Sequence, residues 1–234
     1  MTTRIFLVRH GATVLSAEDR FAGATDVELS NEGRAQAQRL AQRLGAEPLA
    51  AVYTSPMQRT RATAAILAQP HRLTPSARAG LREIDHGRWE GMRRAEVEQQ
   101  FGEEYASWEG DPFTFAPAGG ESGMLVLARA LPVLREIVTA HPRAQVLVVS
   151  HKATIRLLIA SLLGIDARGY RDRLDQLPCC LNIIDFKDPV RARLMLLNDV
   201  SHYAGYPGSA RARGSPSGGT THERTRIPCP TSPS

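Results

Sequence analysis

The sequence predicts an α/β fold, a three-layer α/β/α arrangement with a mainly parallel central sheet. Short apolar runs rich in β-branched residues, typical of strands buried on both faces, lie at residues 5–8, 51–54 and 145–150. Between these runs, apolar side chains recur at helical spacing, as over residues 35–44. Alternating strands and helices indicate a parallel sheet with helices on both faces.

Start and stop signals predict where the helices lie. Ser30 and Ser122 are suited to cap helix N-termini, Ser55-Pro56 is a start signal with proline at the first helical position, and Gly164 is suited to end a helix. Helices are therefore expected at about residues 30–44, 57–67, 93–101, 122–139 and 154–163.

The remaining segments are predicted to form a lid and two closing strands. Residues 111–117 are rich in proline and aromatic residues, so we expect an irregular lid there. Residues 181–186 and 193–197 have strand character, and Lys187-Asp188-Pro189 between them is a turn signal. The two strands are expected to form a hairpin at the end of the domain.

Length and composition predict one domain over residues 1–206. The chain has 234 residues, of which 42% are hydrophobic, and this suffices for one sizeable core. Residues 207–234 are rich in Gly, Ser, Pro and Arg with few large apolar side chains, so we expect a disordered tail. The tail's four arginines and one glutamate contribute +3 of the net charge of +5, so the body is nearly neutral and no nucleic-acid partner is expected.

The sequence favours a cytoplasmic protein without a membrane partner. No run approaches the roughly 18 apolar residues of a membrane span, and no signal peptide is visible. Cys179, Cys180 and Cys229 are odd in number and match neither a disulfide framework nor the spacing of metal ligands. This cysteine usage fits a cytoplasmic protein. We expect neither a metal nor another cofactor.

Five ionisable side chains lie in segments that we expect to meet at one edge of the sheet. They are Arg9, His10, Arg59, Glu83 and His151. In open α/β sheets, ligands bind at the carboxyl ends of the strands, where such segments converge. Gly11, directly after His10, would let a ligand approach the backbone closely and would expose main-chain N–H groups to an anion.

These residue types suit phosphoryl transfer without a metal. Two guanidinium groups and an imidazolium can stabilise the charge on the phosphoryl oxygens. A nucleophilic histidine must be unprotonated, and neighbouring cations lower a histidine pKa from its ordinary value of about 6.5. Glu83 would hold a proton for the departing alkoxide. The residues alone do not decide whether His10 or His151 is attacked.

Five motifs in order resemble the histidine phosphatase superfamily, which includes the cofactor-dependent phosphoglycerate mutases. The motifs are Arg9-His10-Gly11 with the segment at residues 21–33, then residues 54–64, 81–91, Gly119-Gly120-Glu121-Ser122 and Val149-Ser150-His151. The resemblance covers most of residues 4–203. It implies a phosphoglycerate mutase-like fold with His10 as nucleophile, Glu83 as acid and base, and Arg9, Arg59 and His151 holding the phosphoryl group.

The chain departs from the family pattern at two positions. Ser16 stands where the first motif usually has an asparagine, and a serine reaches less far toward a phosphate oxygen as a substrate-binding group. Lys152 follows the second histidine where the family commonly has a small residue. Lys152 could reach a substrate carboxylate or second phosphate, although a lysine extending to solvent from a helix start is the simpler interpretation.

The resemblance implies a phosphatase that hydrolyses a small phosphorylated metabolite. The mutases carry a longer insertion after the acid-bearing loop, whereas only about 30 residues separate His86 from Gly119, and a short lid favours water as the acceptor. Two alternatives stay open: mutase-type phosphoryl transfer and a scaffold that binds phosphorylated ligands without turnover. A scaffold would not need Glu83. A homodimer paired through an edge strand is also open.

Overall fold

The computed structural model describes residues 2–14 and 20–203, and this part of the chain forms a six-stranded sheet. The strands are β1 (Thr3–Arg9), β2 (Leu49–Thr54), β3 (Ser76–Ala77), β4 (Gln145–Ser150), β5 (Leu181–Phe186) and β6 (Ala192–Asp199). Their order is β3-β2-β4-β1-β5-β6. Strands β1 to β4 run parallel, and β5 and β6 run antiparallel at one edge. The predicted mainly parallel sheet is confirmed, and residues 181–199 form the expected hairpin.

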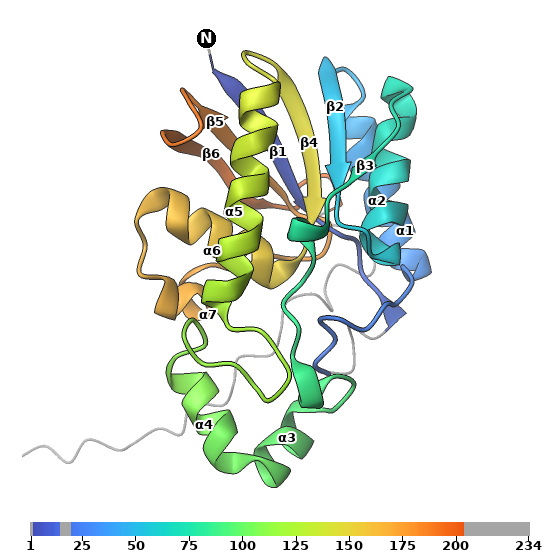
Figure 1. The fold of residues 1–234 in the computed structure, drawn as a ribbon. Helices are drawn as coiled ribbons and strands as arrows, with labels where there is room; N and C mark the ends of the chain where they lie inside the picture. The colour runs from blue at the N-terminus through green and yellow to red at the C-terminus, as the bar shows by residue number, and fades with distance from the viewer. Residues whose placement is uncertain (1, 15–19, 204–234) are drawn as a thin grey trace, which may run out of the picture.

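Helices cover both faces of the sheet (Figure 1). One face carries α1 (Asn31–Leu44) and α2 (Gln58–Ala68), and the other carries α5 (Gly123–Ala140) and α6 (Lys152–Leu163). The shorter helices are α3 (Arg94–Gln100), α4 (Gly102–Gly110) and α7 (Tyr170–Arg173), with 3-10 turns at Gln69–His71, Ala79–Leu81, Gly87–Trp89 and Ala167–Gly169. This is the predicted three-layer α/β/α architecture.

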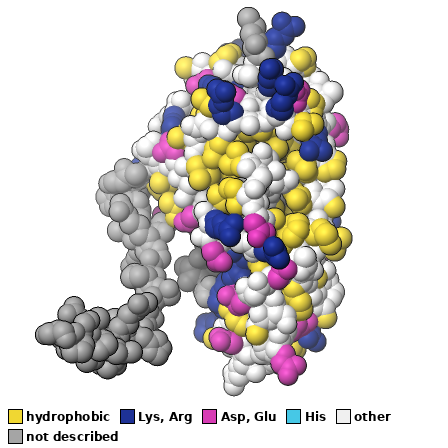
Figure 2. Space-filling view, turned by 90° about the vertical axis from the view of Figure 1, so that its left-hand side faces the viewer, with side chains coloured by type: hydrophobic (Ala, Val, Ile, Leu, Met, Phe, Trp, Pro, Cys, Tyr) yellow, Lys and Arg dark blue, Asp and Glu magenta, His cyan; other side chains and the backbone are white. Residues whose placement is uncertain are grey.

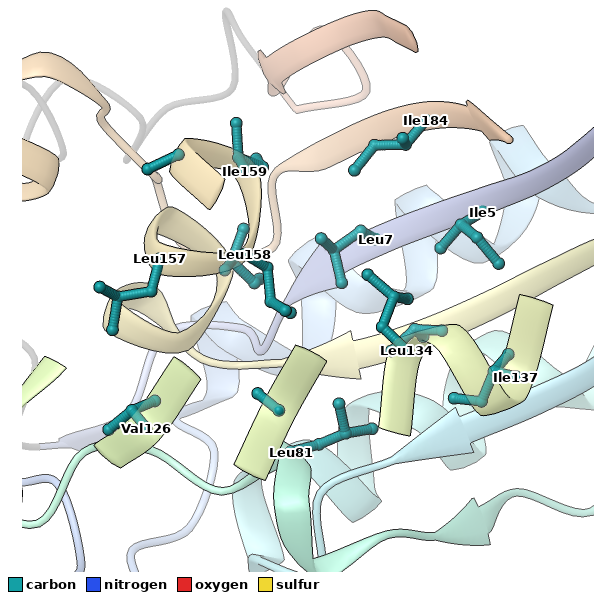
Figure 3. Packing of buried hydrophobic residues seen from close by; sticks show 14 of the residues in the cluster. Ile5, Leu7, Leu81, Val126, Leu134, Ile137, Leu157, Leu158, Ile159 and Ile184 are labelled. Atoms are coloured by element: carbon teal, nitrogen blue, oxygen red, sulfur yellow. The ribbon is translucent and has the colours of Figure 1, made fainter. Parts of the chain in front are cut away.

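The alternation of side chains along β1 separates two hydrophobic cores. Ile5 and Leu7 pack with α5 and α6, whereas Phe6 and Val8 pack with α1 and α2. Figure 3 shows Leu134 and Ile137 of α5 lying over Ile5 and Leu7. Strand β4 divides its side chains in the same way between the two cores. A strand buried on both faces needs apolar residues at every position, which explains the continuous apolar runs.

The helix ends agree with the capping signals at most positions. The Ser30 side chain accepts a hydrogen bond from the Gly33 N–H, and Gly164 ends α6 in the left-handed conformation. The expectation for Pro56 was wrong. Helix α2 begins at Gln58, because the Ser55 N–H donates to the Val149 carbonyl and prolongs the strand pairing beyond Thr54.

Helices α3 and α4 lie below the carboxyl ends of β1, β2 and β4 in Figure 1 and contribute to a third, smaller hydrophobic cluster. It joins Phe21, Trp89, Val97 and Trp108, and it is covered by α3 and α4. Helix α4 was not expected from the sequence, which has glycines at both ends of the segment and no capping signal. The predicted lid residues 111–117 follow α4 directly and form irregular turns. The cluster therefore builds a cap over the edge where the candidate residues end.

Candidate active site

A cavity of about 280 Å³ opens at the carboxyl ends of the parallel strands. Four of the predicted residues line it, namely Arg9, His10, Arg59 and Glu83. They come from β1, α2 and the loop after the 3-10 turn at Ala79–Leu81. The structure thus brings together residues that are up to 74 positions apart in the chain. The fifth residue, His151, is fully buried behind them.

His10 presents one ring nitrogen with a free lone pair. Its Nδ1 lies 2.8 Å from the Gly11 carbonyl oxygen, which only accepts hydrogen bonds, so Nδ1 carries the proton. The lone pair is therefore on Nε2. Burial, and then the charges of Arg9 and Arg59, lower the pKa of His10 well below its ordinary value. His10 is thus neutral at pH 7, as expected of a nucleophile.

His151 packs against His10 with the ring centroids 5.2 Å apart and the ring planes at 63°. Its Nδ1 accepts from Nε of Arg59 at 3.3 Å, so its Nε2 carries the proton and donates to the Ser55 hydroxyl at 2.9 Å. Burial, followed by His10 and Arg59, lowers the pKa of His151 well below its ordinary value. An imidazolium, expected among the groups that stabilise the phosphoryl charge, is disfavoured at His151, because a charge there would lie beside Arg9 and Arg59.

The two arginines are held by backbone carbonyl groups. Arg59 donates from Nη1 to the Thr25 carbonyl and from Nη2 to the Gly23 carbonyl, both at 2.8 Å. Arg9 donates from Nη1 to the Gln176 carbonyl at 2.7 Å, and its Nε is buried without a hydrogen-bond partner. A buried donor without a partner is costly, and Arg9 lines the cavity, so an anion bound there could supply the missing acceptor.

Glu83 is fixed at the N-terminus of α6. Its carboxylate accepts from the backbone N–H groups of Ala153 (3.1 Å) and Thr154 (3.2 Å) and from the Thr154 hydroxyl. This arrangement places the carboxylate beside His151, the residue that precedes α6. The side chain lines the cavity, so a substrate bound by Arg9 would meet it.

Gly11 has a different role from the expected one. Its N–H donates to the Thr63 hydroxyl at 3.2 Å, so it is engaged within the protein. A Cβ at this position would overlap the carbonyl oxygen of Gly33 in α1. Glycine is needed here because the chain after β1 passes directly against α1, and its carbonyl oxygen orients the His10 ring.

Two further expectations concern Ser16 and Lys152. Ser16 lies outside the described residues. Lys152 is the first residue of α6 and lines the cavity, with its side chain 42% exposed and its Nζ 3.8 Å from Asp175. Lys152 is therefore at the site and partly open to solvent, as both interpretations of it require.

Glu90 is a structural member of the site that the sequence did not single out. Its carboxylate accepts from the backbone N–H groups of Gly23, Ala24, Thr25 and His86 and from the Thr25 hydroxyl, at 2.6 to 3.0 Å. Burial alone would raise the pKa of Glu90, but these hydrogen bonds outweigh it and lower the pKa. Because the Gly23 and Thr25 carbonyls hold Arg59, Glu90 positions that arginine indirectly.

Glu121 and Arg129 together hold the segment that carries Glu83, as Glu90 holds the loop that carries Arg59's partners. Arg129 donates from Nη2 to the Glu83 carbonyl at 2.9 Å and to Glu121 at 2.8 Å, and Glu121 accepts from the Asp85 N–H. Glu121 belongs to a motif noted in the sequence, but Arg129 lies two turns further along α5 with no local signal. Only the tertiary contacts reveal its role.

The cavity has the chemistry of an anion site. Two arginines, a neutral histidine with a free lone pair and a carboxyl group converge on one small space. Guanidinium groups match the oxygens of a phosphoryl group, and this site can offer a nucleophile and a proton carrier beside them. In the described parts of the chain, no three His, Cys, Asp or Glu side chains are grouped to hold a metal ion. Fold and site together define the class of phosphoryl-transfer enzymes built on a mainly parallel sheet.

The chain belongs to the histidine phosphatase superfamily (branch 1), whose sequence model matches residues 5–200. This membership confirms the resemblance and the expected enzyme class, a phosphoric monoester hydrolase. Phosphoserine phosphatase 1 of Hydrogenobacter thermophilus is 36% identical over 163 residues, covering 70% of this chain and 77% of that protein. A glucosyl-3-phosphoglycerate phosphatase of Mycobacterium tuberculosis is 33% identical over 175 residues, covering 71% and 78%.

Comparison with solved structures also places this chain beside histidine phosphatases. YhfR of Bacillus stearothermophilus has a TM-score of 0.80 at 32% identity and is matched over 86% of this chain and 98% of its own. A mycobacterial glucosyl-3-phosphoglycerate phosphatase has a TM-score of 0.77 at 28% identity, with 85% and 99% covered. The phosphoglycerate mutase-like fold is therefore confirmed.

Proposed function

We propose that this chain is a metal-independent phosphomonoesterase that hydrolyses a small phosphorylated metabolite through a phosphohistidine on His10. The observation that carries the proposal is the lone pair on the His10 Nε2 in a cavity that Arg9, Arg59 and Glu83 also line. Neutral His10 can attack, and the two guanidinium groups can stabilise the charge that develops on the phosphoryl oxygens.

The reaction takes two steps on these residues. In the first, Nε2 of His10 attacks phosphorus, the bond from phosphorus to the ester oxygen breaks, and Glu83 gives its proton to the departing alkoxide. In the second, water attacks the phosphohistidine, Glu83 takes the proton of that water, and His10 leaves with its electron pair. His151, whose Nε2–H donates to the Ser55 hydroxyl, would have to turn that N–H toward the cavity to contact the transferred phosphoryl group together with Arg9 and Arg59.

Metal independence is proposed because the cationic side chains can supply the stabilisation that a metal would otherwise give. Phosphoryl transfer needs positioning and charge stabilisation more than covalent chemistry from the protein. Arg9 and Arg59 provide two permanent positive charges at the site. No cofactor is required in this scheme.

A small substrate and hydrolysis are supported by the cavity and the relatives. A volume of about 280 Å³ is just below the usual range for sites of drug-sized molecules, about 300 to 1,000 Å³, and so suits a smaller ligand. The relatives are named for phosphoserine and glucosyl-3-phosphoglycerate, and both are named phosphatases. A cytoplasmic location, a catalytic domain spanning residues 1–206, and the absence of nucleic-acid and membrane partners stay predictions. Within residues 2–14 and 20–203, the longest apolar helix falls short of what a bilayer crossing requires.

A homodimer also stays a prediction, for which β6 is the candidate contact. This outer strand exposes Met195 and Leu197. Figure 2 looks onto the side of the molecule where β5 and β6 lie, and it shows hydrophobic side chains gathered in the upper half of this face. An exposed edge strand with such side chains is a template for pairing.

The first experiment measures release of inorganic phosphate from p-nitrophenyl phosphate and trapping of an acid-labile phosphoenzyme. We expect both with the unaltered chain and neither with His10→Ala, while His71→Ala, which changes a histidine outside the cavity, keeps both. Turnover by His10→Ala at the original rate would refute the mechanism. Exchange of phosphoglycerate isomers without phosphate release would support the mutase alternative, and ligand binding without turnover would support the scaffold.

A further inference from the structure

The cavity carries more positive charge than a phosphate group needs. Among the described residues that line it, seven are arginine or lysine and Glu83 is the only carboxylate. Two of the seven, Arg9 and Arg59, serve the proposed phosphoryl end. Of the remaining five, Arg94 and Arg171 pair with Glu109, and Arg20 donates to the Gly91 carbonyl, which leaves Lys152 and Arg156 as the cations to consider at the mouth.

Lys152 and Arg156 form one wall of this mouth. They lie four residues apart on α6 and therefore on one face of the helix. Both approach the same carboxylate, Asp175, at 3.8 Å from Lys152 Nζ and 3.1 Å from Arg156 Nη2. Two cations thus share one anion, which is itself 59% exposed.

Arg156 has an unused hydrogen-bond donor inside the protein. Its side chain is only 11% exposed, and its Nε is buried without a hydrogen-bond partner. A guanidinium group that served only the surface ion pair with Asp175 would leave this N–H in water. Arg156 lines the cavity, and its unsatisfied N–H would gain a partner if the guanidinium met the acceptor of a ligand there.

Lys152 also differs from a lysine that merely extends to solvent. Burial, and then the charges of Arg9 and Arg156, lower its pKa to about 8. Asp175 and Glu83 act in the opposite direction but do not cancel this effect. Lys152 is therefore partly buried beside two other cations, and an anion bound at this wall would favour its charged form.

We propose that Lys152 and Arg156 form a second anion subsite, which binds a carboxylate on the leaving group of the substrate. The guanidinium of Arg156, with its unpartnered Nε–H, and the ammonium of Lys152 can each donate to one oxygen of a carboxylate. A second phosphate would bring another acceptor oxygen and up to two charges to a wall that already contains Asp175. This subsite rests on the proposed function, since it names the substrate class of the same cavity.

Two matched pairs of substrates test the subsite. Phosphoethanolamine is phosphoserine without its carboxylate, and glycerol 3-phosphate is 3-phosphoglycerate with a hydroxymethyl group in place of the carboxylate. We expect the unaltered enzyme to prefer the carboxylate member of each pair by at least about tenfold in kcat/KM, the effect of one charge-assisted hydrogen bond. Equal values within both pairs, or a stronger preference for fructose 1,6-bisphosphate, would overturn the assignment.

Variants then locate the preference. Arg156→Met and Lys152→Met should each raise KM for the carboxylate substrates about tenfold and leave p-nitrophenyl phosphate within about twofold. Lys187→Met removes the same charge from the distant turn before β6 and should change neither. Equal losses on all substrates would contradict the subsite. Retained p-nitrophenyl phosphate turnover shows that a variant is folded, and its absence in the unaltered enzyme would instead refute the proposed function.

Discussion

At the residue scale, the site depends on two histidines that are kept neutral. His10 and His151 are 6% and 0% exposed, and Arg59 contacts His151 while its charge acts on both rings. Because each ring donates its single proton to a fixed oxygen, the tautomers are set by the Gly11 carbonyl and the Ser55 hydroxyl. A neutral, oriented ring is the form in which a histidine can act as a nucleophile.

The proton-donating role of Glu83 can be tested separately from substrate binding. A Glu83→Gln variant keeps the shape of the side chain but cannot donate a carboxylic proton. We expect kcat on glycerol 3-phosphate, which has a poor leaving group, to fall 10²-fold or more, and kcat on p-nitrophenyl phosphate to fall much less. Steady-state kinetics on both substrates measures the difference. Equal losses would remove Glu83 from the acid role.

At the scale of elements, a short irregular loop fixes the position of Arg59. Residues 21–26 have no regular secondary structure, yet Glu90 binds three successive N–H groups in them and their carbonyls bind Arg59. Gly11 serves a similar purpose, because only a glycine lets the end of β1 pass against α1. Gly11 and the loop at residues 21–26 therefore shape the site indirectly, by the way they pack against neighbouring elements.

Removal of Glu90 should therefore affect both stability and turnover. We expect Glu90→Ala to lower the free energy of unfolding by about 2 kcal/mol or more, because four backbone N–H groups, three of them in partly buried hydrogen bonds, lose their acceptor. We also expect kcat/KM for p-nitrophenyl phosphate to fall at least about tenfold, since Arg59 loses its fixed position. Urea unfolding and steady-state kinetics measure the two effects. Glu136→Ala, at an exposed carboxylate of α5, serves as the control and should change neither. A Glu90→Ala protein that matches this control would disprove the positioning role.

At the scale of the whole molecule, one sheet separates two cores and gathers the site at its end. The α1–α2 core and the α5–α6 core bury opposite sides of β1 and β4. Both strands end in a histidine-bearing segment, so packing that aligns the strands also aligns the rings. As a consequence, two histidines that must stay neutral are buried inside the folded protein, and this makes stability depend on pH.

Stability should therefore fall in mild acid. In the unfolded chain, His10 and His151 take up protons near pH 6.5, whereas in the folded chain their pKa values lie well below this. The unfolded state thus binds more protons as pH falls, and folding loses about 1.4 kcal/mol for each of the two between pH 7.5 and 5.5. Urea unfolding at these pH values measures the loss. His151→Asn should reduce the pH dependence, and a constant free energy of unfolding would contradict the burial of neutral rings.

Local sequence patterns predicted much of the fold, but they predicted the site only in part. The strands and most helices were predictable because burial on two faces and capping leave marks at neighbouring positions, as at residues 5–8 and Ser30. Helix α4 was missed because its stability comes from Trp108 packing in the cap cluster. Arg129 and Glu90 were missed because their partners lie far away in the sequence.

The sequence by itself determined the class of the fold, the motif residues and the family, because these depend on residue type and order. The tertiary structure decided what each residue does for its neighbours. It showed that Gly11 is needed for the packing of α1, that His151 is neutral, and that Lys152 and Arg156 share one carboxylate. The burial of a side chain and the electrostatic potential around it depend on residues from many segments of the chain, so they are set only when the chain has folded.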